Sequence, residues 1–319
     1  MDVYDVIIIG SGPAGLTAGV YTSRANLKTL LLAGEKWGGQ LMLTTLVENY
    51  PGFPEGIQGP DLMTNMRKQA EKFGVEVKDE NVTDVNFSQK PFEVFIRTDL
   101  SSVNLSSVKG RSFLGKAVII ATGAEFNWLG LPSEQRLIGR GVSSCATCDA
   151  AFFKDKKVVV VGGGDAAMEE ALVLAKFASE VTVVHRRDQF RASKVMQDRV
   201  MSHPKIKVKF NTEVEEVLGE EKVTGVKFKG GEEMTVDGVF VAIGHSPATK
   251  IFEGKIDLDE KNYAERKFKT MSNVEGVFVA GDVHDHIYRQ AVTAAGYGCE
   301  AALDADRWLT ENGHAVVIQ

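Results

Sequence analysis

The most reactive feature of the sequence is a pair of cysteines in the stretch Cys145-Ala146-Thr147-Cys148-Asp149. At the start of a helix, this spacing lets two sulfurs close a small disulfide ring, and a helix N-terminus lowers the pKa of a thiol. Asp149 follows directly and is a candidate for moving protons as thiols form and leave. We therefore predict a redox-active dithiol rather than two inert structural cysteines.

Two glycine-rich turns predict two sites for dinucleotides. Gly10-Ser11-Gly12-Pro13-Ala14-Gly15 follows an apolar run and precedes a helical pattern, and Gly162-Gly163-Gly164-Asp165-Ala166-Ala167 repeats this arrangement. Such glycines permit a tight turn, close approach of a pyrophosphate and close packing of helix on strand. The phosphates then lie at the helix N-terminus, where free N–H groups favour negative charge.

Basic residues follow the second turn at the position that contacts the ribose. The stretch His185-Arg186-Arg187 and the nearby Arg191 stand where an NAD site would have a carboxylate. Guanidinium groups bind phosphate through paired hydrogen bonds, so this cluster predicts NADPH, with its 2′-phosphate, as the ligand. At the corresponding place in the first half, Glu35 follows Gly34 and is either a ribose ligand or an ordinary surface glutamate.

The elements that position these motifs alternate between strands and helices. Short apolar runs predict buried parallel strands, and helical patterns follow both glycine turns. The predicted strands are 4–9, 29–32, 118–123, 157–161, 181–184, 239–244 and 277–282. This order predicts an α/β fold with two Rossmann-like dinucleotide-binding domains.

Each domain also has a segment with a different pattern. Between 78 and 116, the runs Val94–Ile96 and Val103–Leu105 predict short antiparallel strands. Between 205 and 234, apolar residues alternate with polar ones and predict a second small antiparallel excursion. These alternating residues are Val208, Phe210, Val214, Val226 and Phe228.

The repeat of the motifs predicts the domain organisation. We expect the chain to cross between domains just after Gly123 and near His245. The first domain is then discontinuous and comprises 1–123 and 247–319. The second domain comprises 124–246 and carries the cysteine pair.

Composition excludes several other classes of protein. The 319 residues have a net charge of −6, which disfavours general nucleic-acid binding. Three cysteines are too few for a structural disulfide framework, and the sequence lacks the second Cys pair or Cys–His cluster of a zinc site, so we expect no metal. The sequence contains no apolar run long enough to predict a membrane span. Asp2 and Asp5 stand where a signal peptide would have basic residues. We therefore expect a cytoplasmic protein.

The order of these motifs resembles that of the low-molecular-weight thioredoxin reductases over essentially the whole chain. The stretches that carry the resemblance are Gly10–Gly15, Gly38–Leu41, Val47–Gly52, Ala121–Ala124, Cys145–Asp149, His185–Arg187, Gly244–Pro247 and Gly281–Ala291. The resemblance implies a homodimer in which one domain swings against the other during turnover, with hinges near Gly123 and His245.

The resemblance also implies which residues bind the two cofactors. FAD would be bound in the first domain by Gly10, Ser11, Gly12, Pro13, Ala14, Gly15, Gly34, Glu35, Gly39, Gln40, Leu41, Asn49, Ala121, Thr122, Gly123, Gly281, Asp282, Arg289, Gln290 and Ala291. NADPH would be bound in the second domain by Gly162, Gly163, Gly164, Asp165, Ala166, His185, Arg186, Arg187, Arg191 and Gly244.

The activity that the resemblance implies is that of a thioredoxin reductase. NADPH would reduce FAD, FAD would reduce the Cys145–Cys148 disulfide, and the dithiol would reduce oxidised thioredoxin by thiolate exchange. In the family, Cys148 would be the cysteine nearer the flavin. Asp149 would be the acid or base, and neither nucleic acid nor a membrane would be a partner.

Four alternatives use the same motifs. They are a reductase that serves a peroxiredoxin system, a ferredoxin-fed flavoenzyme, an oxygen-using thiol oxidase and a redox sensor without turnover. A peroxiredoxin reductase often carries an extra thioredoxin-like domain, for which this chain has no room. The arginine cluster favours NADPH over ferredoxin or oxygen, and two dinucleotide units beside a dithiol favour an enzyme over a sensor.

Overall fold

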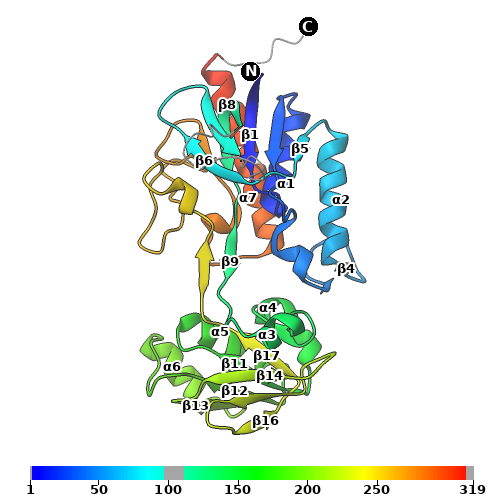
Figure 1. Cartoon of the computed structure of the whole chain (residues 1–319), viewed down its shortest axis with the longest axis vertical. Helices are drawn as coiled ribbons and strands as arrows, with labels where there is room; N and C mark the ends of the chain where they lie inside the picture. The colour runs from blue at the N-terminus through cyan, green and yellow to red at the C-terminus, as the bar shows by residue number, and fades with distance from the viewer. Residues whose placement is uncertain (1, 97–110, 314–319) are drawn as a thin grey trace, which may run out of the picture. The chain divides into compact units, whose positions relative to one another are not determined.

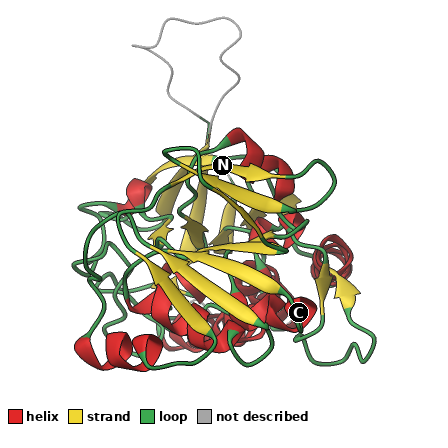
Figure 2. Cartoon of the chain, turned by 90° about the horizontal axis from the view of Figure 1, so that it is seen from below, coloured by secondary structure: helices red, strands yellow, loops and turns green. Residues whose placement is uncertain are grey.

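The computed structural model describes residues 2–96 and 111–313 and divides the chain into two compact units (Figure 1). The first unit comprises Met1–Leu46, Tyr50–Glu125 and Pro247–Gln319, and the second comprises Val47–Asn49 and Phe126–Ser246. The chain contains both helices and strands (Figure 2), and both units have elements of each kind, so the predicted α/β class is confirmed. Val103–Leu105, where a strand was predicted, lies outside the described residues.

The first unit is built on a sheet with the strand order β5-β2-β1-β8-β7-β6, in which β19 also pairs with β8. The pairings β5–β2, β2–β1, β1–β8 and β8–β19 are parallel, whereas β6 and β7 extend the sheet antiparallel. The strands are β1 (Val3–Ile9), β2 (Thr29–Leu32), β5 (Glu76–Lys78), β6 (Val82–Asn86), β7 (Phe92–Ile96), β8 (Ser112–Ile120) and β19 (Val277–Val279). The antiparallel strand predicted around Val94–Ile96 is therefore β7.

In the first unit, helix α7 packs closely on helix α1. Gly298 packs so closely on α1 that an added Cβ would lie 2.1 Å from the Ala14 carbonyl oxygen, which brings α7 onto the first turn of α1. The remaining elements are α1 (Pro13–Arg24), η1 (Gly39–Leu43), β3 (Leu46–Val47), β4 (Ile57–Gln58), α2 (Gly59–Lys72), η3 (Lys250–Phe252), η4 (Gly281–Val283) and α7 (Ala291–Glu311).

The second unit contains a parallel sheet with the order β10-β17-β11-β12-β13 and a separate antiparallel sheet β14-β15-β16. The strands are β10 (Val142–Ser143), β11 (Lys157–Val161), β12 (Glu180–Val184), β13 (Ile206–Lys209), β14 (Val214–Leu218), β15 (Gly225–Phe228), β16 (Glu233–Thr235) and β17 (Gly238–Val241). The helices are α3 (Pro132–Leu137), α4 (Ala146–Asp149), η2 (Ala150–Phe153), α5 (Asp165–Leu174) and α6 (Lys194–Met201).

One prediction about the second unit is wrong. Val208 and Phe210 were assigned to the antiparallel excursion. Val208 instead lies on β13, where it pairs in parallel with Val183 of β12, and Phe210 directly follows that strand. The excursion begins only at Val214. Alternation of apolar and polar residues marks a strand with one buried face, and it does not distinguish a parallel edge strand from an antiparallel one.

Two short strands carry the chain between the units. They are β9 (Ala124–Phe126) on the outward pass and β18 (His245–Pro247) on the return, and they pair with each other. The Phe126 and His245 rings lie 4.6 Å apart, and the Ser246 hydroxyl donates a hydrogen bond to Asn127 Oδ1. Within the described residues, no helix is long and apolar enough to span a membrane.

Candidate functional site

Cys145 and Cys148 form a disulfide across the first turn of α4, as the spacing predicted. Cys145 is the N-cap residue of this short helix, and its sulfur accepts a hydrogen bond from the Cys148 backbone N–H at 3.2 Å. Cys148 is exposed and Cys145 is half-buried. Within its unit, the disulfide is therefore accessible to an attacking thiolate.

A buried hydroxyl group links the disulfide turn to Asp149. Ser143 Oγ accepts the backbone N–H of Cys145 at 3.1 Å and donates to Asp149 Oδ2 at 2.6 Å. Burial raises the pKa of the Asp149 carboxyl group, and the hydrogen bond from Ser143 opposes that rise. A carboxyl group with a raised pKa, one residue after Cys148, suits proton transfer to and from the dithiol.

A second carboxylate contacts the same turn from another helix. Glu170 of α5 accepts a hydrogen bond from the backbone N–H of Ala146 through Oε2. Ala146 is the first residue of α4, and its N–H has no partner within that helix. Sequence reasoning missed both Glu170 and Ser143, because hydrogen bonding to a backbone group leaves no motif in the sequence.

The glycine turn of the second unit leaves an open surface at the start of α5. An added Cβ at Gly162 would lie 2.3 Å from the Ala242 carbonyl oxygen, and one at Gly163 would lie 2.3 Å from the His185 ring. At Gly164, the N-cap residue of α5, an added Cβ would meet nothing within 4 Å. The first two glycines of the turn thus pack closely against neighbouring residues, and the third faces open space.

The basic loop after β12 folds back onto this turn. The backbone N–H groups of Arg191 and Ala192 donate to the Gly163 carbonyl oxygen at 2.7 and 3.1 Å. The side chains of Arg186, Arg187 and Arg191 are exposed, and none of the three forms an ion pair with a described residue. Their charges are therefore free to meet an anion at the turn.

His185 and Asp165 differ from the arginines in this loop. The His185 ring is buried against Gly163, and burial and then Arg191 lower its pKa, so the ring is neutral at pH 7. Among the described residues, its Nε2 has no hydrogen-bond partner. Asp165 Oδ1 accepts both the N–H and the hydroxyl of Ser193, at 2.9 and 2.7 Å, and so fixes the start of α6.

The glycine turn of the first unit has the same design. An added Cβ would lie 2.2 Å from the Ala121 carbonyl oxygen at Gly10 and 1.9 Å from the Gly10 carbonyl oxygen at Gly15. At Gly12 it would meet nothing within 4 Å. Gly12, like Gly164, thus faces open space at the N-terminus of a helix, where a pyrophosphate fits.

Ser11 ties this turn to the loop that follows β2. Its hydroxyl donates to the Ala33 carbonyl oxygen and accepts the Gly38 N–H, both at 2.9 Å. The loop thereby brings Gly39 beside Gly12, and Gln40 donates from Nε2 to the Ala124 carbonyl oxygen. The loop places one end of η1 at the glycine turn.

Two predicted ligands lie differently. The Glu35 side chain is exposed, and its backbone N–H donates to Asn81 Oδ1 at 3.0 Å. Asn49 falls in the segment that belongs by its contacts to the second unit. The hydrogen bond of Glu35 therefore joins its backbone to Asn81 and not to the glycine turn.

A buried carboxyl group lies at the end of β19. Gly281 is so close to α1 that an added Cβ would lie 2.8 Å from Ala14 Cβ, which places the next residue, Asp282, near the glycine turn. Asp282 Oδ1 is buried and has no hydrogen-bond partner among the described residues. Burial and then the charge of Asp285 raise the pKa of Asp282 to about 7. An unpaired buried carboxyl oxygen predicts a ligand that donates hydrogen bonds to it.

Asp285 shapes the segment that leads into α7, and sequence reasoning missed it. Its carboxylate accepts the backbone N–H groups of Ile287, Tyr288 and Arg289, at 2.9, 2.9 and 3.1 Å. This turn positions Gln290, which is the N-cap residue of α7. The predicted residues Asp282, Arg289, Gln290 and Ala291 thus lie on one ordered segment.

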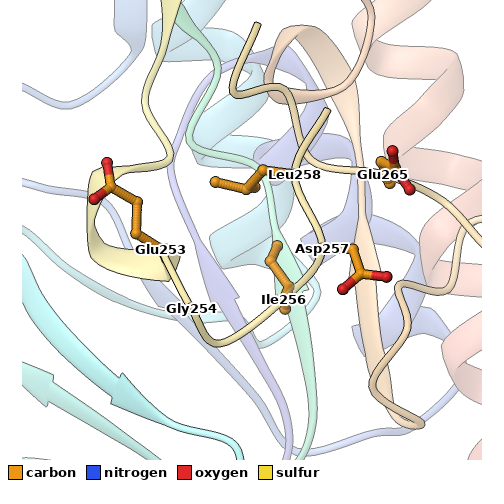
Figure 3. Close-up of a pocket in the computed structure, with 6 residues that line it drawn as sticks. All are labelled: Glu253, Gly254, Ile256, Asp257, Leu258 and Glu265. Atoms are coloured by element: carbon orange, nitrogen blue, oxygen red, sulfur yellow. The ribbon is translucent and has the colours of Figure 1, made fainter. Parts of the chain in front are cut away.

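A pocket elsewhere in the first unit contains none of the predicted residues. It is lined by Glu253, Gly254, Ile256, Asp257, Leu258 and Glu265 (Figure 3). Lys267 pairs with both Asp257 and Glu265, at 3.1 and 2.5 Å, so its positive charge offsets part of the negative charge of the pocket. Across residues 2–96 and 111–313, no cluster of three or more His, Cys, Asp or Glu residues could bind a metal.

Comparison with known proteins gives consistent matches over nearly the whole chain. Residues 4–298 match the family described as pyridine nucleotide-disulphide oxidoreductase. A thioredoxin reductase of Streptomyces clavuligerus is 53% identical over 315 residues, which cover 97% of this chain and 94% of that protein. A bifunctional thioredoxin reductase/thioredoxin of Mycobacterium leprae is 49% identical over 97% of this chain and 67% of its own length. A solved structure of thioredoxin reductase from Giardia duodenalis is 42% identical, with a TM-score of 0.88, and covers 97% of this chain and 100% of that one.

Proposed function

The chain belongs to the pyridine nucleotide-disulphide oxidoreductase family, and within it we propose that the protein is an NADPH-dependent, FAD-containing thioredoxin reductase. The observation that carries the proposal is the accessible Cys145–Cys148 disulfide beside the buried carboxyl group of Asp149. A structural disulfide needs neither an exposed sulfur nor a proton-holding neighbour, whereas thiol–disulfide exchange needs the first and is assisted by the second.

We assign FAD to the first unit, and we propose that the FAD-binding domain is discontinuous and comprises 1–123 and 247–319. The open face of Gly12 accommodates the pyrophosphate, and the unpaired Asp282 Oδ1 suits a hydroxyl group of the ribityl chain. The further residues that we assign to FAD are Gly10, Ser11, Pro13, Ala14, Gly15, Gly34, Glu35, Gly39, Gln40, Leu41, Asn49, Ala121, Thr122, Gly123, Gly281, Arg289, Gln290 and Ala291.

We assign NADPH to the second unit, and we propose that the NADPH-binding domain comprises 124–246. The open face of Gly164 suits the pyrophosphate, and the three exposed arginines suit the 2′-phosphate. The residues assigned to this site are Gly162, Gly163, Gly164, Asp165, Ala166, His185, Arg186, Arg187, Arg191 and Gly244. Because its ring is buried under Gly163, His185 supports the turn, and the arginines supply the charge.

The residues of this chain that react directly are the two cysteines of the dithiol. Bound FAD supplies two-electron transfer between NADPH and the disulfide. Two electrons and two protons convert the Cys145–Cys148 disulfide into two thiols. One cysteine, as thiolate, then attacks the thioredoxin disulfide to form a mixed disulfide, and the other displaces the reduced partner and restores the ring. Asp149, held by Ser143, takes and returns the proton that each exchange moves.

Thioredoxin is the proposed partner. The relative from Mycobacterium leprae is described as a bifunctional thioredoxin reductase/thioredoxin, which supports a small dithiol protein as the electron acceptor. We further propose a homodimer, on the resemblance to the family, and a cytoplasmic location, where a dithiol system remains reduced. Sedimentation of the FAD-loaded protein at twice the mass of 34.7 kDa would support the dimer, and sedimentation at the monomer mass would refute it.

The decisive experiment follows NADPH oxidation by the FAD-loaded protein with oxidised thioredoxin, beside NADH and a Cys148→Ser variant. We expect rapid turnover that requires both NADPH and thioredoxin and falls by at least about 1,000-fold in the variant. Turnover of a low-molecular-weight disulfide without thioredoxin would point to another acceptor. Bound FAD that NADPH does not bleach would instead favour a ferredoxin-fed enzyme or an oxidase.

A further inference from the structure

Glu170 connects two motifs that the proposed function treats separately. It lies on α5, the helix that begins at the glycine turn, and its carboxylate accepts the backbone N–H of Ala146, between the two cysteines. The two residues are 24 positions apart in the sequence. The nucleotide-binding helix therefore holds the redox turn directly by a charge-assisted hydrogen bond.

Packing fixes this contact within the second unit. Ala146 of α4 is 1% exposed, Ala171 of α5 is fully buried, and both belong to one hydrophobic cluster with Ala150 and Ala167. Small side chains on both helices let the two backbones approach closely. The distance between α5 and α4 is therefore short enough for the Glu170 side chain to reach the redox turn.

The charge of Glu170 lies close to the reacting sulfur. By covalent geometry, a carboxylate oxygen bonded to the Ala146 N–H is within roughly 8 Å of Cys145 Sγ. Reduction converts an uncharged disulfide into a dithiol that is partly ionised, and a neighbouring carboxylate disfavours that thiolate. A redox couple whose reduced form is less stabilised is a stronger reductant.

We propose that Glu170 is a positioning residue of the redox turn, and that its charge makes the Cys145–Cys148 dithiol a stronger reductant. The inference deepens the proposed function and rests on it, because a reductase of thioredoxin gains from a low dithiol potential. Asp149 is the other carboxyl group at this turn, but it is bonded to Ser143 and serves proton transfer.

The test measures the potential of the dithiol in the FAD-loaded protein without turnover. Anaerobic buffers of dithiothreitol and its cyclic disulfide set the poise, and each Cys145–Cys148 bond that breaks oxidises one dithiothreitol by two electrons and two protons. Thiols are then trapped with a maleimide and counted by mass, with the free Cys299 as an internal reference.

Glu170→Gln removes the charge and keeps an oxygen that can accept the Ala146 N–H. We expect the dithiol–disulfide equilibrium to shift about three- to tenfold toward the dithiol, which is a rise in potential of roughly 15 to 30 mV. Glu169→Gln is the matched control. Glu169 is exposed, and its substitution removes the same charge one residue away from Glu170. An equal shift in the two variants, or no shift in Glu170→Gln, would overturn the role of the charge.

Glu170→Ala also removes the hydrogen-bond acceptor and tests the positioning role. We expect thioredoxin turnover about tenfold below that of Glu170→Gln, with the KM for NADPH unchanged. Equal turnover in the two variants would overturn positioning. Failure of the wild-type protein to reduce thioredoxin would refute the proposed function instead, and the potentials would still decide the role of Glu170.

Discussion

The two units contain the same kind of glycine turn at the start of a helix, and they differ in the residues that surround it. In both, the first glycine of the turn lies against a carbonyl oxygen of a neighbouring strand end, and the glycine before the helix faces open space. Beyond the turn, the first unit offers Asp282, one of whose carboxyl oxygens is buried and unpaired, whereas the second offers three exposed arginines.

This difference suits two kinds of ligand. A buried hydrogen-bond acceptor without a protein partner costs free energy when no ligand is bound, so it favours a ligand that stays bound. Exposed guanidinium groups lose little when the ligand leaves and attract a phosphate again from solution. The first unit is thus suited to a resident cofactor and the second to a nucleotide that exchanges in every cycle.

The largest effect is expected where the two turns differ in packing. In Gly15→Ala, the new Cβ would lie 1.9 Å from the Gly10 carbonyl oxygen. We expect the free energy of unfolding to fall by about 3 kcal/mol and FAD to be released, because two backbone segments must move apart. Urea unfolding, followed by tryptophan and flavin fluorescence, measures both effects.

The control for that prediction comes from the second unit. Gly164→Ala adds a Cβ that meets nothing within 4 Å, so stability should change by less than about 1 kcal/mol while NADPH binding weakens. If the two alanine variants lost the same stability, the packing difference between these two positions would be refuted.

The exposed charges of the second unit give the next largest effect. Replacing Arg186, Arg187 and Arg191 together by glutamine should lower the preference of kcat/KM for NADPH over NADH by about 100-fold. Raising the salt concentration should weaken the preference of the wild-type enzyme but not that of the variant. Arg199→Gln, an exposed arginine on α6, is the control, and an equal loss there would refute a specific phosphate site.

The buried carboxyl group of the first unit predicts a pH dependence. The folded-state pKa of Asp282 is raised to about 7, above its ordinary value of 3.8, so the cofactor-free protein binds this proton more tightly than the unfolded chain does. The stability from this group is therefore full below about pH 4 and is lost as pH rises to about 7. In Asp282→Asn apoprotein, this loss should disappear, which makes the variant more stable than wild type at pH 8.

The same substitution should act in the opposite direction on cofactor binding. Asp282→Asn replaces one carboxyl oxygen, which can accept a hydrogen bond from the ribityl chain, by an amide NH2 group, which can only donate. We therefore expect FAD affinity to fall about tenfold, as measured by flavin fluorescence quenching. A variant that bound FAD as tightly as wild type would refute a role for Asp282 in cofactor binding. An apoprotein variant that kept the wild-type pH slope would refute Asp282 as the group that titrates.

The smallest effect concerns the redox turn, which has no counterpart in the first unit. Ser143→Ala removes the hydrogen bond that lowers the pKa of Asp149 against the effect of burial, so that pKa should rise further. We expect thiol–disulfide exchange to slow about fivefold at pH 7 and its pH profile to move to higher pH. Ser144→Ala, the neighbouring change, should leave the profile in place; a shift in both variants would argue against the Ser143–Asp149 contact.

Local sequence determined the motifs and the fold class of this protein. Each glycine turn and the cysteine pair is a contiguous stretch, so its backbone conformation follows from a few neighbouring residues. The apolar runs that end in glycine likewise predicted the buried parallel strands. The assignment of Val208 to an antiparallel sheet was wrong, because strand direction depends on a partner that the strand's own sequence does not specify.

Only the tertiary structure decided which polar groups meet across the chain. Ser143 was next to the motif but gave no signal, and Glu170 reaches Ala146 from another helix. Burial was also decided there, since His185 stands beside Arg186 in the sequence but packs under Gly163 while the arginine is exposed. Hydrogen bonding and desolvation depend on distance in space, and folding sets that distance after the sequence has fixed the local turns.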